Sequence, residues 1–252
     1  MQNNKTRNVN GFTLVELAVS LLIIGLLTAG ALKGRALLDN ARVASFMSEL
    51  DAIEMAHINF VNLYGELPGD LRASGVLPGC GADNANFCAD GNQDGAIGTI
   101  ATATGINTSL SVEHAMYWKH LVLSKFYTGL DPTVDINDAD NMERGVTHPM
   151  IYRNTVLDII HLTRSGCAGF ECNEGPTYRL QPDFFRYTGA VGEGAIKPLY
   201  AERIDRKLDD GLPDTGRVQA EASSSECDTG RVYNSQNDSY NCVMFFQIGH
   251  GS

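Results

Sequence analysis

Oxygen-bearing side chains alternate in the stretch "DGNQDG", where Asp90, Asn92 and Asp94 are followed by Gly95. This spacing turns several oxygens toward the concave side of a loop, and calcium prefers oxygen ligands of this kind. Asp90, Asn92 and Asp94 are therefore candidate calcium ligands.

The calcium loop is incomplete by itself. The position at which an EF-hand loop carries its bidentate glutamate is Ala101 in this chain. We expect Glu113, at the start of a predicted helix, to complete the site from a distance. The alternative is an Asx/Gly turn beside Cys88 that binds no metal.

The six cysteines form three pairs that are local in sequence: Cys80 with Cys88, Cys167 with Cys172, and Cys227 with Cys242. All six follow an apolar N-terminal stretch, which predicts disulfides in an oxidising compartment. Proximity alone favours these three pairings, and free buried thiols are the alternative. Zinc is disfavoured because no pair has CxxC spacing.

Glu16 is an ionisable residue inside the apolar stretch "GFTLVELAVSLLIIGLLTAGAL" from Gly11 to Leu32. As a helix, residues 12–32 would extend about 31 Å, enough to cross a bilayer. The preceding "MQNNKTRNVNG" has two basic residues and no acidic one, which places it on the cytoplasmic side. A lone carboxylate in hydrocarbon costs at least about 2.5 kcal/mol, so Glu16 needs a partner or a proton. The alternative is a carboxylate tolerated near the headgroups by the helix dipole.

Helical periodicity continues beyond the apolar stretch. One stripe, repeating at steps of three and four, consists of Val43, Phe46, Leu50, Ile53, His57, Phe60 and Tyr64. Gly65 and "LPGD" then end the helix. The pattern predicts a helix over residues 12–64 whose first half contains the transmembrane segment 12–32 and whose second half is amphipathic.

The remainder, residues 65–252, has the composition of an α+β head. Strands are expected within 150–162, 177–181 and 241–248, and helices over 112–126 and 198–208. The predicted fold class is therefore α+β, with a long N-terminal helix packed on a globular head that contains an antiparallel sheet.

The segment "G-FTLVEL", followed by an uninterrupted apolar helix, resembles the processing and assembly segment of type IV pilins and of the pseudopilins of type II secretion. The segments "YGELPGDL" at 64–71 and "IDRKLDDGLPDTGRV" at 204–218 resemble parts of large-headed members. The pair Cys227 and Cys242 resembles the disulfide that closes a C-terminal loop in many pilins.

The resemblance implies a leader, residues 1–11, that a prepilin peptidase removes between Gly11 and Phe12, with methylation of the new Phe12 amine. It also implies a bacterial inner-membrane protein whose head faces outward, and which then joins other pilin subunits in a periplasmic or extracellular filament. In that filament Glu16 would pair with the Phe12 amine of a neighbouring subunit.

The bulk composition bears on the function. A formal net charge of −11 disfavours nucleic acid as a partner. The chain contains no GxSxG, HExxH or phosphate-binding glycine loop, so we expect a structural subunit and no enzyme. The alternative is a membrane-anchored enzyme or binding receptor with a pilin-like anchor.

Overall fold

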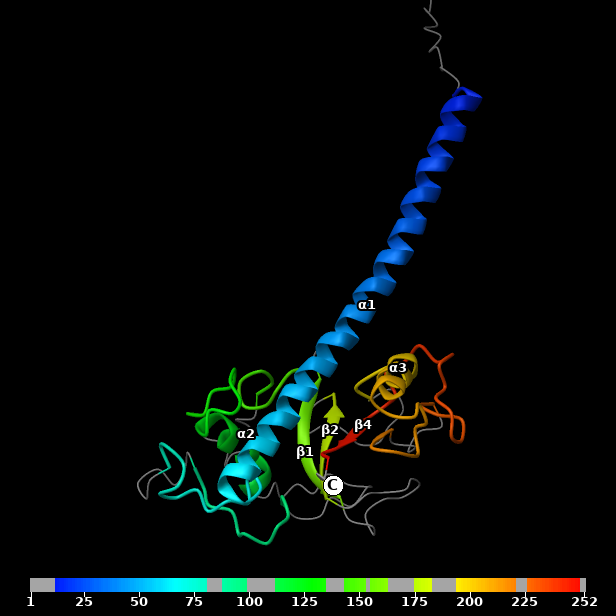
Figure 1. Cartoon of the computed structure of the whole chain (residues 1–252). Coiled ribbons are helices and arrows are strands. Elements are labelled where there is room, and N and C mark those ends of the chain that lie inside the picture. The colour runs from blue at the N-terminus through cyan, green and yellow to red at the C-terminus, as the bar shows by residue number, and fades with distance from the viewer. Residues whose placement is uncertain are drawn as a thin grey trace, which may run out of the picture. The chain divides into compact units, whose positions relative to one another are not determined.

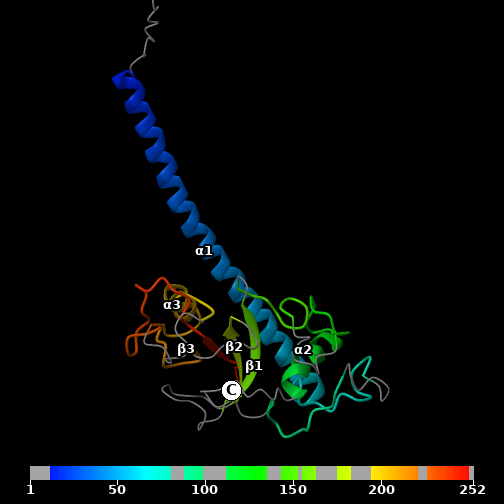
Figure 2. The ribbon, with the colours of Figure 1, turned by 180° about the vertical axis from the view of Figure 1, so that it is seen from behind.

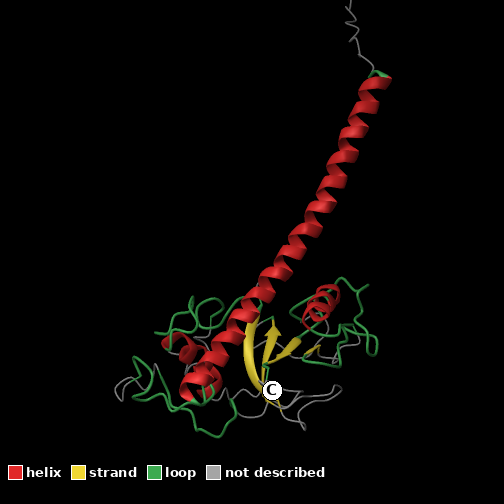
Figure 3. Ribbon diagram, viewed as in Figure 1, coloured by secondary structure: helices red, strands yellow, loops and turns green. Residues whose placement is uncertain are grey.

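The structure is a computed structural model, and it describes residues 12–80, 88–98, 112–134, 143–152, 155–162, 175–182, 194–220 and 226–249. Its elements in chain order are α1 (Leu14–Tyr64), α2 (Val112–Leu123), β1 (Val156–Leu162), β2 (Gly175–Gln181), α3 (Pro198–Leu208), β3 (Val218–Ala220) and β4 (Met244–Gln247). Helices and strands both contribute to the fold, and the α+β prediction is confirmed (Figure 3).

The chain divides into two compact units, Met1–Arg42 and Val43–Ser252, and the boundary lies within α1. In the first unit the apolar side chains from Phe12 to Leu38 that the structure describes are exposed. Among the described residues, α1 is the one helix long and apolar enough to cross a membrane, by length and composition.

The second unit is built on a four-stranded antiparallel sheet in the order β1-β2-β4-β3. Helix α2 lies at the β1 end of this sheet and α3 at the β3 end (Figures 1 and 2). Because β1 and β2 pair over seven residues whereas β3 contributes three, most of the regular pairing is at the α2 end.

The C-terminal half of α1 supplies one wall of the core. The predicted stripe is buried from Val43 to Phe60, and Tyr64 is half-buried at its end. Phe46 lies 5.4 Å from Phe246 of β4 between ring centroids. The amphipathic half of the predicted helix is therefore confirmed, since its apolar positions face the sheet.

Polar contacts fix the same half of α1 in register with the head. His57 Nδ1 lies 2.9 Å from the Tyr117 hydroxyl, which lies 2.7 Å from that of Tyr178. Burial lowers the pKa of His57 to about 4, so its ring is neutral at pH 7. The chain of hydrogen bonds therefore crosses from α1 through α2 to β2 without a buried charge.

Several predicted boundaries differ from the observed ones. The strand expected within 150–162 begins at Val156, because the preceding Thr155 N–H donates to the Tyr152 carbonyl and not to a neighbouring strand. Helix α2 ends at Leu123, and Lys125 adopts a φ of 65° that no α-helix continues. Strand β3 was not predicted, because three residues are too few to give a periodic signal.

Candidate functional site

The N-terminus of α1 is closed by a reciprocal cap between Thr13 and Glu16. Glu16 Oε2 accepts hydrogen bonds from the Thr13 backbone N–H at 3.0 Å and from its hydroxyl at 2.9 Å. Glu16 N–H in turn lies 3.3 Å from Thr13 Oγ1. The spacing T-x-x-E is the sequence signature of a capping box, and it gives Glu16 a local partner in addition to the predicted one.

Other polar side chains in the apolar half of α1 are also satisfied within the helix. Ser20 Oγ donates to the Glu16 carbonyl at 2.7 Å, and Thr28 Oγ1 donates to the Ile24 carbonyl at 3.0 Å. Hydrocarbon offers no hydrogen-bond partners, so such back-bonding suits a membrane segment. Phe12 is 84% exposed, and Gly11 lies outside the described residues.

A second candidate site lies where the turn after α1, the loop 88–98 and the start of α2 meet. One carboxylate oxygen from each of Asp70, Asp94 and Glu113 lies within 4.8 Å of the other two. Asp70 and Glu113 are buried and Asp94 is exposed. Oxygens around a calcium ion at 2.3–2.6 Å would have separations of this order.

Backbone N–H groups hold the loop 88–98, the acidic loop, around the buried carboxylates of Asp70 and Glu113. Asp70 accepts the N–H groups of Asp94 at 3.2 Å and Gly95 at 2.9 Å, one on each oxygen. Glu113 accepts those of Asn92 at 2.9 Å and Gly98 at 2.8 Å. Glu113 therefore reaches the loop, as the sequence predicted, and each carboxylate oxygen keeps a lone pair for a further partner.

The structure changes the predicted ligand set. Asp90 Oδ1 accepts the Ser74 N–H at 2.8 Å and Oδ2 lies 3.5 Å from Arg72 Nε, so this carboxylate belongs to a neighbouring contact and is not in the cluster. The side chain of Asn92 bonds Asp94 in an Asx turn. Asp70, which was not among the predicted ligands, lies in the cluster instead, and its sequence separation of 24 from Asp94 hid this relation from the sequence.

Close packing behind the loop leaves no room for side chains at two glycines. A Cβ on Gly91 would lie 2.0 Å from the Asp70 carbonyl oxygen, and one on Gly69 would lie 2.3 Å from that of Glu113. Gly69 N–H also donates to His120 Nδ1 at 2.9 Å. Burial lowers the pKa of His120 to about 4, which keeps the ring neutral as an acceptor.

Two predicted disulfides are confirmed, Cys80–Cys88 beside the acidic loop and Cys227–Cys242 near the C-terminus. Cys167 and Cys172 lie outside the described residues. The first bond ends at Cys88, two residues before Asp90, and the second closes the loop 226–242. Both are consistent with the oxidising compartment that the cysteine count predicts.

Asp158 on β1 is a buried carboxylate with three polar partners. Its Oδ1 lies 3.2 Å from His114 Nε2, and its Oδ2 accepts from Arg179 at 3.0 Å and from Gln181 at 3.2 Å. Although burial opposes it, the charges of His114 and Arg179 hold the pKa of Asp158 below its usual range. This cluster stabilises the contact of α2 with the sheet, and its burial denies access to a substrate.

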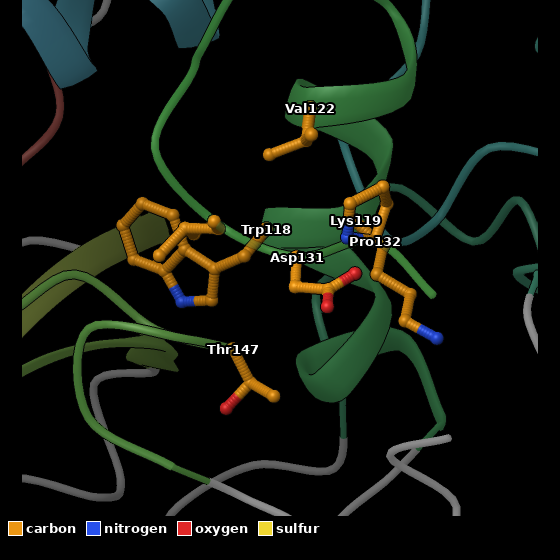
Figure 4. A pocket seen from close by; sticks show the side chains of 7 residues that line it. Trp118, Lys119, Val122, Asp131, Pro132 and Thr147 are labelled. Atoms are coloured by element: carbon orange, nitrogen blue, oxygen red, sulfur yellow. The ribbon is translucent and has the colours of Figure 1, made fainter. Parts of the chain in front are cut away.

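Two hollows lie elsewhere in the described part of the head. One, of about 610 Å³, has mainly apolar walls with His57, Asn62 and His161 among its lining residues, and its described lining contains no carboxylate or thiol. The other lies beside α2, between Trp118, Asp131 and Thr147 (Figure 4), and has no space for a water molecule.

Comparison with known proteins identifies the N-terminal segment. Residues 6–32 match the model of the prokaryotic N-terminal methylation motif, which is the signature of the prepilin-type segments of type IV pilins and pseudopilins. This match shows that the protein has a prepilin-type N-terminal segment. More specifically, the motif supports a pilin-like or pseudopilin-like protein. No curated protein and no solved structure matches the chain.

Proposed function

We propose that this chain is a structural subunit, a pilin or pseudopilin, of a type IV-like pilus or a type II secretion pseudopilus. The observation that supports the proposal most is the methylation motif at residues 6–32, which overlaps a helix that continues to Tyr64. We further propose that cleavage after Gly11 and assembly through this helix give the protein its role.

In this proposal Glu16 has two successive partners. Within one chain the Thr13 cap supplies two donors to its carboxylate, which lowers the cost of placing a charge near hydrocarbon. In a filament, the Phe12 amine of a neighbouring subunit supplies a positive charge. An ion pair in a low-dielectric surrounding is stronger than a neutral hydrogen bond, so it favours one register between subunits.

The proposal implies particular partners and places. Before assembly the chain is inserted in the inner membrane with its head outward, and a prepilin peptidase cleaves it. After assembly it binds other pilin subunits in a homo- or hetero-filament. The filament lies in the periplasm or outside the cell. The disulfides Cys80–Cys88 and Cys227–Cys242 suit either place.

The N-terminus of the mature protein tests this function. Mass spectrometry should find N-methylated Phe12 as the first residue. The variant Gly11→Ala keeps the apolar segment unchanged and serves as a control for processing. An intact leader, or a first residue other than Phe12, would contradict the proposal and favour the membrane-anchored enzyme or receptor.

The pairing of Glu16 is tested by two substitutions. Glu16→Ala should leave cleavage intact and remove the subunit from sheared filaments. Glu16→Gln keeps a side chain that can complete the capping box but has no charge. If the ion pair directs assembly, the glutamine variant is lost from filaments as well. Normal incorporation of Glu16→Gln would show that the helix cap alone matters.

We also propose that the acidic loop binds calcium through Asp70, Asp94 and Glu113. The closeness of the three carboxylates supports this site. Calcium at 100 times its dissociation constant should raise the unfolding free energy by about 2.7 kcal/mol, and chelator should reverse the gain. Asp94→Asn should abolish the response while Asp90→Asn keeps it. Equal melting temperatures with calcium and with chelator would refute calcium binding.

A further inference from the structure

Three aspartates gather where α3 ends and the turn 209–216 begins. Asp205, Asp209 and Asp210 each place one carboxylate oxygen within 4.8 Å of the other two. Asp205 is completely buried, Asp209 is half-buried and Asp210 is exposed. Like charges this close repel one another most strongly where water is excluded.

Asp205 connects α3 to two other segments. Its Oδ1 accepts the Gly211 N–H at 3.1 Å, and its Oδ2 accepts the Tyr233 hydroxyl at 2.8 Å. Tyr233 belongs to the loop 226–242 that Cys227 and Cys242 close. The Asp205 carboxyl group therefore joins the helix, the turn after it and the C-terminal loop.

The other two aspartates organise the turn itself. Asp209 Oδ2 accepts the N–H groups of Arg217 and of Val218, the latter at 3.1 Å, where β3 begins. Asp210 accepts the Leu212 N–H at 2.8 Å and the Thr215 hydroxyl at 2.6 Å. Repulsion within the cluster therefore acts directly on the turn and on the first residue of β3.

The basic side chains around the cluster are directed to other carboxylates. The pairs are Arg206 with Glu202 at 2.5 Å, Arg217 with Glu54 at 3.1 Å and Arg231 with Asp214 at 3.4 Å. Lys207 is exposed on α3. Asp228, 9% exposed, adds negative charge beside Tyr233. The Arg206 side chain packs beside Gly211 but its guanidinium bonds Glu202, so the groups that contact Asp205 directly are the neutral Gly211 N–H and Tyr233 hydroxyl.

This environment favours the protonated acid at Asp205. Burial, together with the charges of Asp210 and Asp209, raises the pKa of Asp205 to about 7 against the opposing hydrogen bonds from Tyr233 and Gly211. Burial and the charge of Asp205 raise the pKa of Tyr233 as well, so its hydroxyl remains a donor. One proton can therefore remain in the cluster near neutral pH.

We propose that Asp205, Asp209 and Asp210 form a proton-controlled latch, which holds the turn 209–216 and the loop 226–242 on α3 while Asp205 is protonated. Loss of that proton to solvent leaves Asp205 as a third carboxylate and weakens the hold. Because the folded state binds this proton more tightly than the unfolded state, the stabilisation is complete below pH of about 4 and is lost as the pH rises toward 7.

The substitution Asp205→Asn tests the latch, because an amide has nearly the shape of the protonated acid and does not ionise. The full chain in detergent micelles, with excess chelator, is melted at pH 5 to 8.5. The melting temperature of the variant minus that of the wild type should rise by roughly 5 °C over this range and level off above the titration.

The difference in melting temperature between variant and wild type does not include the effect of histidine titration. Burial lowers the pKa of His57 and His120 to about 4 and that of His148 to about 3, and their titration makes the wild type less stable in acid. These histidines are present in both proteins and cancel in the comparison. The exposed Asp51 provides the control, since Asp51→Asn removes a carboxylate that lies on α1, outside the cluster.

Hydrogen exchange locates the effect. After correction for intrinsic rates, peptides from 209–218 and 226–242 should exchange several-fold faster at pH 8 than at pH 6 in the wild type and at equal rates in Asp205→Asn. Asp210→Asn removes one exposed like charge, so it should move the midpoint of this change to lower pH. It also tests the latch if Asp205→Asn fails to fold. A pH-independent difference in melting temperature, or an unmoved midpoint, would overturn the proposal.

Discussion

At the scale of single residues, the head depends on a few buried charges whose partners come from separate elements. Asp158 on β1 meets Arg179 across the strand pair and His114 from α2. Arg179 is 85% buried in its side chain, so it has little water to replace a lost carboxylate. The stability of this group therefore depends on keeping all its members together.

We expect Asp158→Asn to lower the unfolding free energy by about 3–5 kcal/mol, because it leaves a buried guanidinium without its counter-charge. Urea denaturation of the head, followed by tryptophan fluorescence, measures this loss. Asp238→Asn is the matched control: it removes an aspartate that also pairs with a cation, Lys197, but is 94% exposed. That change should cost less than about 1 kcal/mol. Equal losses in the two variants would contradict the role of burial.

At the scale of elements, α1 joins the head through one face of its C-terminal half. Phe60 is fully buried and its ring lies 4.6 Å from that of Tyr64 and 6.2 Å from that of His120. Leu63, three residues later, is 64% exposed. Phe60 therefore contributes to the packing of α1 on the head, whereas Leu63 contributes only to the helix itself.

Phe60→Ala should destabilise the head by about 3–5 kcal/mol, since it opens a cavity between α1 and α2. Leu63→Ala should change stability by no more than about 0.5 kcal/mol. Thermal unfolding monitored by near-ultraviolet circular dichroism distinguishes the two. A small effect of Phe60→Ala would mean that the helix can leave the head without disrupting its core.

The loop 88–98 is held by backbone contact at Gly91. We expect Gly91→Ala to destabilise the head by about 1–3 kcal/mol, because the new methyl group overlaps the Asp70 backbone. Gly75→Ala is the control: its φ is 75° but its Cβ position is open, so it reports backbone strain alone. Limited proteolysis near residue 90 should increase in the Gly91 variant and remain unchanged in the control.

At the scale of the whole molecule, the core is drawn from the unit Val43–Ser252. The apolar window in the first half of α1 buries none of its residues within the chain. We therefore predict that residues 43–252 fold alone as a soluble fragment whose melting temperature matches that of the head in the full chain. Far- and near-ultraviolet circular dichroism check this, and an unfolded fragment would show that the first unit is needed for the head.

The sequence alone determined the features that depend on local order along the chain. The apolar run after "GFTLVE" and the stripe that follows it predicted α1, because helical periodicity requires only neighbouring residues. Short separations likewise predicted Cys80–Cys88 and Cys227–Cys242, both of which the structure contains. The signature T-x-x-E for the cap of Glu16 was equally local and could have been read from the sequence.

Tertiary structure decided which distant residues meet. Asp70 joins Asp94 and Glu113 only because the turn after α1 packs against the loop 88–98 and the start of α2. Asp205 faces Tyr233 because a disulfide-closed loop returns to α3. Such contacts depend on how separate surfaces pack, and the free energy of that packing is spread over many side chains. The sequence of one chain therefore gives the residue types but not which residues become neighbours.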